Sequence, residues 1–353
     1  MNENLMHFSV GIACIENGAE FPISSFIKEI LLLCSAYKID ACVFSPILID
    51  YTVPSPQIPV QYWDGTAFRQ AIAPVPKVID CHFKLQHRTT AAWLQPERQR
   101  WLLERSAIAD QGILKEKLSQ ILMCSPLYPL AIPSYRPKEY EELQQYAKML
   151  RHCIVKPVNG RQGRDICRVD YDGDMLSIES ANGIEELTPS RWAEYLATLT
   201  RDGFSAPLLQ PRLDFSLDAE HAVDFRLLVA RGASGLWEEA AIYARIGATR
   251  LVSNVSKGGY ISDVESILEE IAGSRADELL SELHRIAAEL PVLIQQYNKD
   301  RLISCLGIDV GIDRQTLQPY VIEANTRPGA KYHSWQLAHK RVQYYQYLLK
   351  NTQ

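Results

Sequence analysis

The sequence lacks the short motifs that identify many nucleotide, metal and redox sites. It contains no G-x-x-x-x-G-K-[ST] segment and no H-E-x-x-H segment, which excludes a Walker A loop and a zincin-type helix. Its eight cysteines include no C-x-x-C pair and no metal-type spacing. Because several of them, such as Cys34 and Cys305, lie in apolar segments, we expect reduced thiols in the core.

Strong charge and long apolar runs are also missing. The net charge of −5 gives no broad electrostatic case for a nucleic-acid partner or an anionic membrane. No apolar run approaches the length of a membrane span, and the first residues lack the basic region of a signal peptide. No internal repeat or low-complexity segment is present. The expectation is a soluble, cytoplasmic protein with neither a nucleic-acid nor a membrane partner.

The length and composition predict a folded chain of two or three subdomains. The chain has 353 residues, of which 47% are hydrophobic and 22% are charged. Apolar runs at residues 6–14 and 41–44 flank an amphipathic helix that begins at Ser24 or Ser25 and ends near Tyr37. This β-α-β order implies parallel strands joined by a right-handed crossover.

A third strand is predicted at residues 78–81, after a proline-rich stretch at residues 53–76. The N-terminal part is therefore expected to form a small open α/β layer that ends near residue 105. The rest of the chain alternates further helices and strands. Helices are predicted at residues 113–123, 139–150, 188–203, 261–271 and 276–297. Strands are predicted at residues 153–158, 166–171, 175–178, 208–213, 223–230 and 237–246.

Two short features refine this outline. Asp172-Gly173 is a two-residue hairpin signal between two of the predicted strands. The apolar segments at residues 306–312 and 320–324 flank a polar turn and predict a final hairpin. The chain thus reads as an α/β layer, then a mixed antiparallel module, then a larger α+β module.

The final hairpin carries three oxygen-bearing side chains. If its turn is centred on Thr316, Asp309 lies opposite Glu323, and Asn325 shares a face with Glu323 because it is two residues away. Carboxylates that converge on an apolar hairpin favour a hard divalent cation such as Mg²⁺. Removal of one acid from such an empty site is not expected to destabilise the protein, because it relieves repulsion. The alternative is a two-sided hairpin with solvated acids.

A second candidate site is the segment from Val155 to Gly163. It places Lys156 in an apolar strand before a loop that contains Gly160 and Gly163. Glycine lets backbone N–H groups approach a ligand closely, and such a loop can cradle phosphate. The alternative is a β-hairpin with a solvated lysine.

Two arginines lie within predicted strands. Arg226 follows Asp224 by two residues, and Arg245 lies in the next strand. Buried guanidinium groups need anions, and phosphate or carboxylate groups are their usual partners. The alternative is a structural ion pair of Asp224 with Arg226 or Arg245, which would account for one arginine but hardly for both.

The order of these signals along the chain resembles the ATP-grasp superfamily. Four segments look more closely like the YheC/YheD family of endospore coat-associated proteins. They are V-K-P-V-N-G-R-Q-G-R at residues 155–164, D-F-R at 224–226, N-V-S-K-G-G at 254–259 and L-G-I-D at 306–309. The resemblance covers most of residues 110–330 and extends weakly over the N-terminal layer. Its specificity lies in the combination of motifs.

The resemblance implies an ATP-grasp fold of the α/β (α+β) class. An N-terminal open α/β layer would precede a central small antiparallel module and a C-terminal α+β module. We place the limits of these domains at residues 1–107, 108–206 and 207–353. ATP and two Mg²⁺ ions are the expected cofactors.

The resemblance also implies roles for single residues. Lys115 and Lys156 would neutralise the α- and β-phosphates of ATP beneath the loop from Gly160 to Gly163. The metal ligands would be Asp309, Glu323 and Asn325. Groups at the reacting phosphoryl or acyl group would be Arg245, Arg226, Asn254, Gly258 and Gly259, with Arg226 facing the substrate carboxylate or the phosphate.

The nucleotide-binding strand departs from the usual pattern of the superfamily, which carries an acidic pair there. Gln210 and the backbone of Leu213 would serve adenine, and Asp214 would replace the acid that contacts ribose. A preference for another nucleotide therefore stays open.

The implied activity is that of an ADP-forming carboxylate–amine or carboxylate–thiol ligase that acts through an acyl phosphate. Its partners would be ATP and a carboxylate and an amine from a small molecule or a peptide. Two alternatives stay open: a non-catalytic protein with a structural or assembly role in the spore coat, and an ATP-dependent phosphotransferase. The sequence leaves open whether the chain forms a homodimer. The expected location is the cytoplasm, and the family name adds the spore as a second location.

The acceptor site is not readable from the sequence. Residues 53–76 and the region after Pro328, which includes Lys331 and His333, could line it. The second region equally suits a packed C-terminal helix, which is the preferred interpretation.

Overall fold

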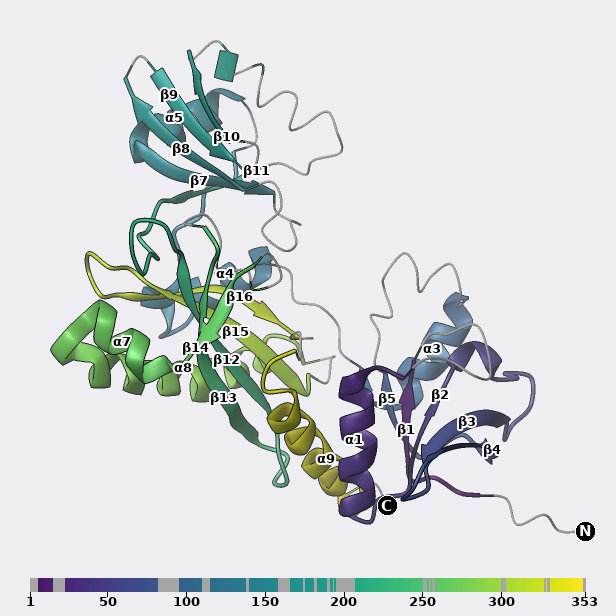
Figure 1. Cartoon of the computed structure of the whole chain (residues 1–353). Helices are drawn as coiled ribbons and strands as arrows, with labels where there is room; N and C mark the ends of the chain where they lie inside the picture. The colour runs from purple at the N-terminus through teal and green to yellow at the C-terminus, as the bar shows by residue number, and fades with distance from the viewer. Residues whose placement is uncertain are drawn as a thin grey trace, which may run out of the picture.

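Three β-sheets organise the part of the chain that the structure describes (Figure 1). The computed structural model contains all 353 residues. The structure describes residues 6–14, 23–81, 95–109, 115–137, 140–157, 166–173, 175–180, 183–188, 191–192, 194, 207–249, 253, 255, 258–299, 303–326, 328 and 331–351. The mixed α/β architecture agrees with the expected fold class.

The first sheet is built around the predicted β-α-β unit. Its order is β4-β3-β2-β1-β5-β6. Helix α1 (Ser25–Ala36) connects β1 to the parallel strand β2, and the Ser24 hydroxyl caps it by accepting the N–H of Ile27. Helix α3 (Pro96–Arg105) connects β5 to β6. The strands are β1 (Val10–Ala13), β2 (Ala41–Phe44), β3 (Gln57–Trp63), β4 (Phe68–Pro74), β5 (Val78–Cys81) and β6 (Ser106–Ala109).

The proline-rich stretch, in which no strand was predicted, forms the antiparallel hairpin β3–β4. Pro59 lies in β3 but beyond the residues that pair with β2, since that pairing ends at Val60. Pro74 is the last residue of β4. Proline is tolerated at such positions because no neighbouring strand needs its missing N–H.

The second sheet is antiparallel throughout, in the order β10-β9-β8-β7-β11. Helix α5 (Tyr140–Leu150) packs against it. Asp172 pairs with Met175, so the predicted hairpin is present but its two loop residues start one position later, at Gly173. The strands are β7 (His152–Pro157), β8 (Cys167–Asp172), β9 (Met175–Ser180), β10 (Gly183–Leu187) and β11 (Pro207–Pro211). The helix predicted from residue 188 lies mostly outside the described residues.

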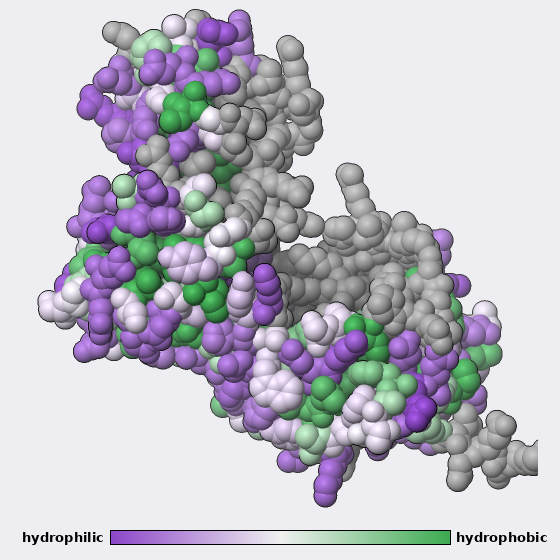
Figure 2. Space-filling model, viewed as in Figure 1, coloured by the Kyte–Doolittle hydropathy of each residue, from purple (hydrophilic) through white to green (hydrophobic). Residues whose placement is uncertain are grey.

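Strand β10 forms one edge of the second sheet. It exposes Ile184, Glu185 and Glu186. Charged side chains on an edge strand disfavour pairing with a strand of another chain. Hydrophilic residues accordingly dominate the surface of this module, at the top of Figure 2.

The third sheet carries the largest apolar core. Its order is β14-β13-β12-β15-β16, and helices α7 (Val264–Ala272) and α8 (Ala276–Gln296) cover one of its faces. Helix α4 (Lys115–Met123) packs against α8 and β16. The strands are β12 (Val223–Arg231), β13 (Trp237–Ile246), β14 (Tyr260–Ser262), β15 (Cys305–Ile312) and β16 (Pro319–Asn325). The predicted helices and the final hairpin are therefore confirmed, with ends shifted by a few residues.

Two helices pack into the core of a sheet whose strands are far from them in the sequence. Leu118 and Leu122 of α4 belong to the core of the third sheet. Val342 and Tyr345 of the C-terminal helix α9 (Ser334–Asn351) belong to the core of the first sheet. Figure 1 shows α9 alongside α1, where it reaches from the third sheet to the first. The predicted packed C-terminal helix is confirmed, while the predicted domain limits stay predictions.

All eight cysteines lie in the described part of the chain, and each is a free thiol there. Six are buried, Cys14 is half-buried and Cys124 is exposed. Burial raises the pKa of the Cys34 thiol to about 12. The predicted core thiols are confirmed. Within the described ranges, no helix is long and apolar enough to cross a membrane.

A buried ion pair joins α9 to the first sheet. Arg341 donates two hydrogen bonds to the Asp80 carboxylate, at 2.6 and 2.5 Å, and the Tyr345 hydroxyl donates a third. Arg341 also donates to the Ser304 hydroxyl at 3.3 Å, one residue before β15. Asp80 is completely buried and Arg341 almost so. These contacts tie the first sheet to the strand that carries Asp309.

Asp80→Ala should lower the free energy of unfolding by about 3–5 kcal/mol, because it leaves the Arg341 guanidinium buried without its carboxylate. Replacement of both partners by apolar residues, Asp80→Leu with Arg341→Met, should recover much of this loss. Urea unfolding measures both. The control is Glu289→Ala, which removes an exposed pair with Arg285 on helix α8 and should change little. An equal effect of Asp80→Ala and Glu289→Ala would contradict the assignment.

Candidate functional site

The third sheet has one apolar face and one polar face. In β15, Ile308 and Val310 point to the core under α7 and α8, so Asp309 points to the opposite face. In β12, Arg226 pairs directly with Asp309, and Asp224 pairs directly with Arg245 of β13. Strand register therefore gathers two carboxylates and two guanidinium groups on the polar face.

These four side chains form a connected set of ion pairs. Arg245 donates to both oxygens of Asp224, each at 2.6 Å. Arg226 donates from Nε to Asp309 Oδ1 and from Nη2 to Oδ2, the latter at 3.0 Å. Arg245 Nη2 also lies 2.9 Å from Asp309 Oδ2, which links the two pairs. The Ser253 hydroxyl, one residue before the N-V-S-K-G-G segment, also donates to Asp224.

The charges of this cluster set its pKa values. Burial raises the pKa of Asp224, and the like charge of Asp309 adds to the effect although Arg245 opposes it. Burial acts the same way on Asp309, but Arg226 and Arg245 outweigh it and hold the pKa of this carboxyl below its ordinary value. The stability that Asp309 contributes is therefore complete above the ordinary carboxyl pKa and is lost as the pH falls through the lowered one.

Both arginines thus have protein carboxylates as partners. The alternative of an Asp224–Arg245 pair is present in the structure. Asp309 supplies the second partner, which pairs with Arg226. The expectation that the Asp224 ion pair could not account for both arginines is therefore confirmed, although the anion at Arg226 is a protein carboxylate that the sequence argument did not consider. The roles predicted for Arg226 and Arg245 toward a substrate stay predictions.

Gly307 makes room for the Arg226 guanidinium. A Cβ at this position would lie 3.3 Å from Arg226 Nη1 and 2.7 Å from the Cβ of Pro328. Gly307 also lies two residues from Asp309 on the same face of β15. The glycine of the L-G-I-D segment therefore lets Pro328 pack against β15 and leaves space beside the Arg226 guanidinium.

The predicted pairing of Asp309 with Glu323 is confirmed, but the geometry that produces it differs. The turn is closed by Asp313 and Gln318, which centres it half a residue before the predicted position at Thr316. A bulge between Asp309 and Val310 then restores the register. Without the bulge, Glu323 would fall one residue out of register and onto the other face.

The oxygen donors of this hairpin suit Mg²⁺. Asn325 lies opposite Gly307, two residues beyond Glu323, and both side chains are partly exposed. Within the described ranges, no group of three His, Cys, Asp or Glu side chains is arranged as a metal site. Carboxylate and amide oxygens are nevertheless the ligands that Mg²⁺ takes. The side chains of Glu323 and Asn325 could bind the ion as they lie. Asp309 could bind it once one of its oxygens gives up its contact with an arginine.

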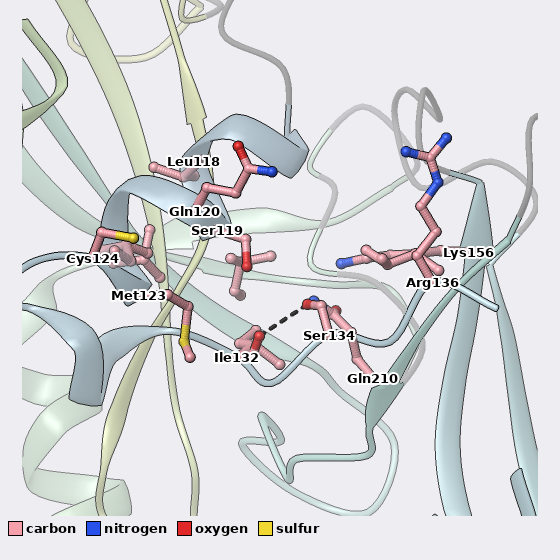
Figure 3. Close-up of a pocket in the computed structure, with 14 residues that line it drawn as sticks. Leu118, Ser119, Gln120, Met123, Cys124, Ile132, Ser134, Arg136, Lys156 and Gln210 are labelled. Atoms are coloured by element: carbon pink, nitrogen blue, oxygen red, sulfur yellow. Dashed lines mark hydrogen bonds between the residues drawn. The ribbon is translucent and has the colours of Figure 1, made fainter. Parts of the chain in front are cut away.

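A pocket of about 300 Å³ lies between α4, the second sheet and β16 (Figure 3). Its walls are largely apolar, and Lys156 points into it from the side opposite α4. Gln210 Nε2 donates to the Ser134 hydroxyl at 2.7 Å within the pocket. The apolar residues in the lining are Leu118, Leu122, Met123, Ile132, Leu208, Val321 and Ile322.

The segment that contains Ser134 joins two sheets. Ala131 pairs with Val321 of β16, and Tyr135 pairs with Leu209 of β11. Ser134 and Arg136 therefore face the pocket from a loop between the sheets. Sequence reasoning missed both residues, because this short stretch after Pro133 has no periodic pattern.

The other predicted residues divide into three groups. Gly160, Gly163 and Asn254 lie outside the described residues, as does the side chain of Lys115 at the start of α4. Gly258 and Gly259 directly precede β14, whose Tyr260 pairs with Ile246, and their predicted contact with the acyl group stays a prediction. Leu213 and Asp214 are not part of the pocket lining.

Asp214 instead stabilises the turn between β15 and β16. Its backbone N–H donates to Asp313 Oδ1 at 2.9 Å, and its carbonyl accepts the N–H of Arg314 at 2.8 Å. Its carboxylate accepts the Ser216 hydroxyl. These contacts give Asp214 a structural role. Its predicted contact with ribose stays a prediction.

This combination of fold and site defines an ATP-grasp protein. The chain belongs to the YheC/D like ATP-grasp family, whose family model matches residues 108–352. The endospore coat-associated protein YheC of Bacillus subtilis (strain 168) is 22% identical over 228 residues, which are 64% of this chain and 61% of that protein. The chain thus matches about three fifths of the length of this curated relative.

Several solved structures have a similar fold, among them two ATP-grasp proteins. One is a RiPP-associated ATP-grasp ligase from Chryseobacterium gregarium, solved with ADP and a leader and core peptide. It has a TM-score of 0.50 at 11% identity and covers 98% of this chain and 97% of its own. The other is the C-terminal domain of Pby1 from K. lactis, an ATP-grasp enzyme that interacts with the mRNA decapping enzyme Dcp2. It has a TM-score of 0.50 at 12% identity, with coverages of 95% and 91%. At these identities the likeness concerns the fold.

The two acids of the hairpin should differ in their effect on stability. Asp309→Ala leaves Arg226 buried without this carboxylate and should cost about 3–5 kcal/mol. Glu323→Ala removes a partly exposed acid and should cost much less, which replaces the expectation that neither acid stabilises the protein. Urea unfolding in the absence of Mg²⁺ measures both variants. Equal losses would show that the ion pairs of Asp309 do not stabilise this sheet.

Proposed function

We propose that this protein is an ATP- and Mg²⁺-dependent ligase that joins a carboxylate to an amine or a thiol through an acyl phosphate. The observation that supports this proposal is the continuity between the pocket and the acidic hairpin. Val321 and Ile322 line the pocket, and the next residue, Glu323, lies opposite Asp309. A nucleotide base in the pocket would thus direct its phosphates toward the acids and arginines.

In this proposal the nucleotide base lies between the apolar walls of the pocket. Gln210 and Ser134 offer polar groups to its edge. Lys156 supplies a positive charge on the pocket wall and would neutralise phosphate charge together with Lys115. The loop from Gly160 to Gly163 is proposed to cover the phosphates.

Asp309, Glu323 and Asn325 are proposed to hold two Mg²⁺ ions. When bound, Mg²⁺ screens the charge of the β- and γ-phosphates. Around the ions, the protein side chains bind and orient the two reactants. ATP itself carries the driving force, so positioning accounts for much of the catalysis.

The arginines are proposed to act where negative charge develops. The substrate carboxylate attacks the γ-phosphorus, and the bond to the β-phosphate oxygen breaks to release ADP. The amine then attacks the acyl carbon, and phosphate leaves. Arg245 would stabilise the transferring phosphoryl group and the tetrahedral oxyanion, while Arg226 would orient the carboxylate. Asn254 and the backbone of Gly258 and Gly259 would face the acyl group.

Amino acids or peptides are the proposed substrates. The RiPP-associated ligase, whose fold is similar, was solved with a leader and core peptide, which supports a peptide in this class of site. The similarity to an endospore coat-associated protein supports a substrate or a location at the spore. The alternative is a structural role without catalysis, and the hydroxylamine experiment below distinguishes it from ligase activity.

Hydroxylamine should intercept the acyl phosphate. Incubation with ATP, Mg²⁺ and hydroxylamine across the amino acids and short peptides should yield ADP and a hydroxamate with the correct carboxylate. Arg245→Lys keeps the charge but loses the bidentate geometry, so it should lower turnover more than ATP affinity.

Two results would favour the rivals. A stable phosphorylated product without hydroxamate or amide indicates a phosphotransferase. Absence of ADP release with every acceptor favours the structural role in the coat.

Lys156→Ala should weaken ATP binding roughly tenfold or more, because it removes a charge-assisted contact to phosphate from the pocket. The matched control is Lys148→Ala, an exposed lysine of α5 that lies over the Tyr171 ring. Calorimetry with ATP and Mg²⁺ measures both affinities. If the two variants bind ATP equally well, Lys156 has no role at the phosphates.

A further inference from the structure

A row of four side chains crosses the polar face of the third sheet. Glu323 of β16 pairs with Asp309 of β15, and Asp309 pairs with Arg226 of β12. Arg226 pairs in turn with Tyr243 of β13. Directly paired residues of antiparallel strands place their side chains on the same face, with Cβ atoms about 5 Å apart. The row therefore begins at two acids, continues with an arginine and ends at a tyrosine.

The neighbours of Tyr243 in β13 fix the direction of its side chain. Ala244 and Ile246 belong to the apolar core under α7 and α8, so Tyr243 and Arg245 point to the polar face. Only 4% of the Tyr243 surface is exposed. Its ring stacks on the ring of His333, with centroids 4.8 Å apart. His333 thus supports the ring at the end of the row.

The hydroxyl of Tyr243 is a donor without an acceptor. It makes no hydrogen bond to the part of the chain that the structure describes, and its oxygen is not shielded from solvent. Burial raises the pKa of Tyr243, although Arg226 and Arg245 oppose the effect. The hydroxyl therefore keeps its proton near neutral pH and is available to donate to a ligand.

The two arginines also keep donors for a ligand. Arg226 uses Nε and Nη2 to hold Asp309, and Arg245 uses the same two atoms to hold Asp224. Nη1 of each guanidinium makes no hydrogen bond within the described ranges and is not shielded from solvent. Because a guanidinium carries five N–H donors, the ion pairs fix each arginine and still leave part of it free to bind an anion.

We propose that Tyr243 is a substrate-binding residue, whose hydroxyl and Arg226 Nη1 donate to the two oxygens of the carboxylate that is to be activated. This inference rests on the ligase activity proposed above and specifies how its acid substrate is held. A carboxylate is repelled by the acids at the other end of the row, so it binds best at the tyrosine end. There it would face the γ-phosphate, which would lie with Mg²⁺ at the acids. Arg245 Nη1 remains for the phosphoryl group.

Tyr243→Phe tests the proposal, because it removes the hydroxyl and keeps the ring that stacks on His333. The probe is N-acetylglycine, which carries a carboxylate beside a peptide bond and has no amine. Ligand-observed NMR in the presence of ADP and Mg²⁺ should detect binding to the wild type. Tyr243→Phe should bind the probe about tenfold more weakly, since a hydrogen bond to a charged group is lost. Absence of binding to the wild type, or equal binding to both proteins, would overturn the proposal.

Tyr344→Phe is the matched control. Tyr344 of α9 is 3% exposed, its ring stacks on Tyr347, and its hydroxyl makes no hydrogen bond to the described residues. It lies in the core of the first sheet, so its variant should bind N-acetylglycine as the wild type does. The melting temperature of Tyr243→Phe should not fall, because the hydroxyl has no partner in the protein to lose. A clear fall with unchanged probe binding would assign the hydroxyl a structural role.

His333 should affect binding only through Tyr243. Its backbone has a φ of 55°, which asparagine also adopts, so His333→Asn keeps the backbone and removes the stacked ring. Alone, this change should weaken N-acetylglycine binding severalfold. Added to Tyr243→Phe, it should weaken binding no further. Equal effects in the two backgrounds would contradict a positioning role for His333.

The reaction gives an independent readout. In the hydroxamate assay, Tyr243→Phe should raise the KM for the carboxylate about tenfold and leave the KM for ATP unchanged. An equal rise of both KM values would contradict a contact with the acid substrate. If the wild type forms no hydroxamate but binds N-acetylglycine in a manner that depends on Tyr243, the ligase proposal fails and the carboxylate site stands.

Discussion

The two linked ion pairs on the third sheet are the interaction on which the rest of the site depends. Charged groups leave water at a cost of several kcal/mol each unless partners compensate them. Here two guanidinium groups meet two carboxylates on one face, so the cluster is close to neutral. This balance requires three strands in fixed register, and Gly307 leaves space beside the Arg226 guanidinium. The bulge that aligns Glu323 with Asp309 completes the same face.

Much of the fold follows from local patterns in the sequence. Alternating and continuous apolar runs predict the strands around the site, and a serine before an amphipathic run predicts α1. The hairpin β3–β4 was missed because prolines argue against strands, and only the extent of pairing with β2 explains why Pro59 is tolerated. The position of α9 was also not readable. Its contact with Asp80 joins residues 261 positions apart, and no local signal records such a pair.

The residues of the site could be predicted from the sequence better than the contacts between them. Lys156 and the acids of the hairpin could be named because each interrupts an apolar strand, whereas Gln210 was named from the resemblance to the ATP-grasp superfamily. Their partners could not be named. The argument from the sequence considered only Asp224 as a protein partner of the two arginines, because Asp224 lies two residues from Arg226. Asp309 lies 83 residues from Arg226 and reaches it through the pairing of β12 with β15. Ser134 and Arg136 were missed because a loop between sheets carries no periodicity.

The neutral cluster also limits how a nucleotide can enter the proposed site. A phosphate that takes Arg245 leaves Asp309 with one partner fewer, and a buried carboxylate then needs another cation. In the same way, a divalent ion that binds Asp309 without a phosphate takes a carboxylate partner from Arg226 and Arg245. Phosphate and Mg²⁺ are therefore favoured together more than either is alone.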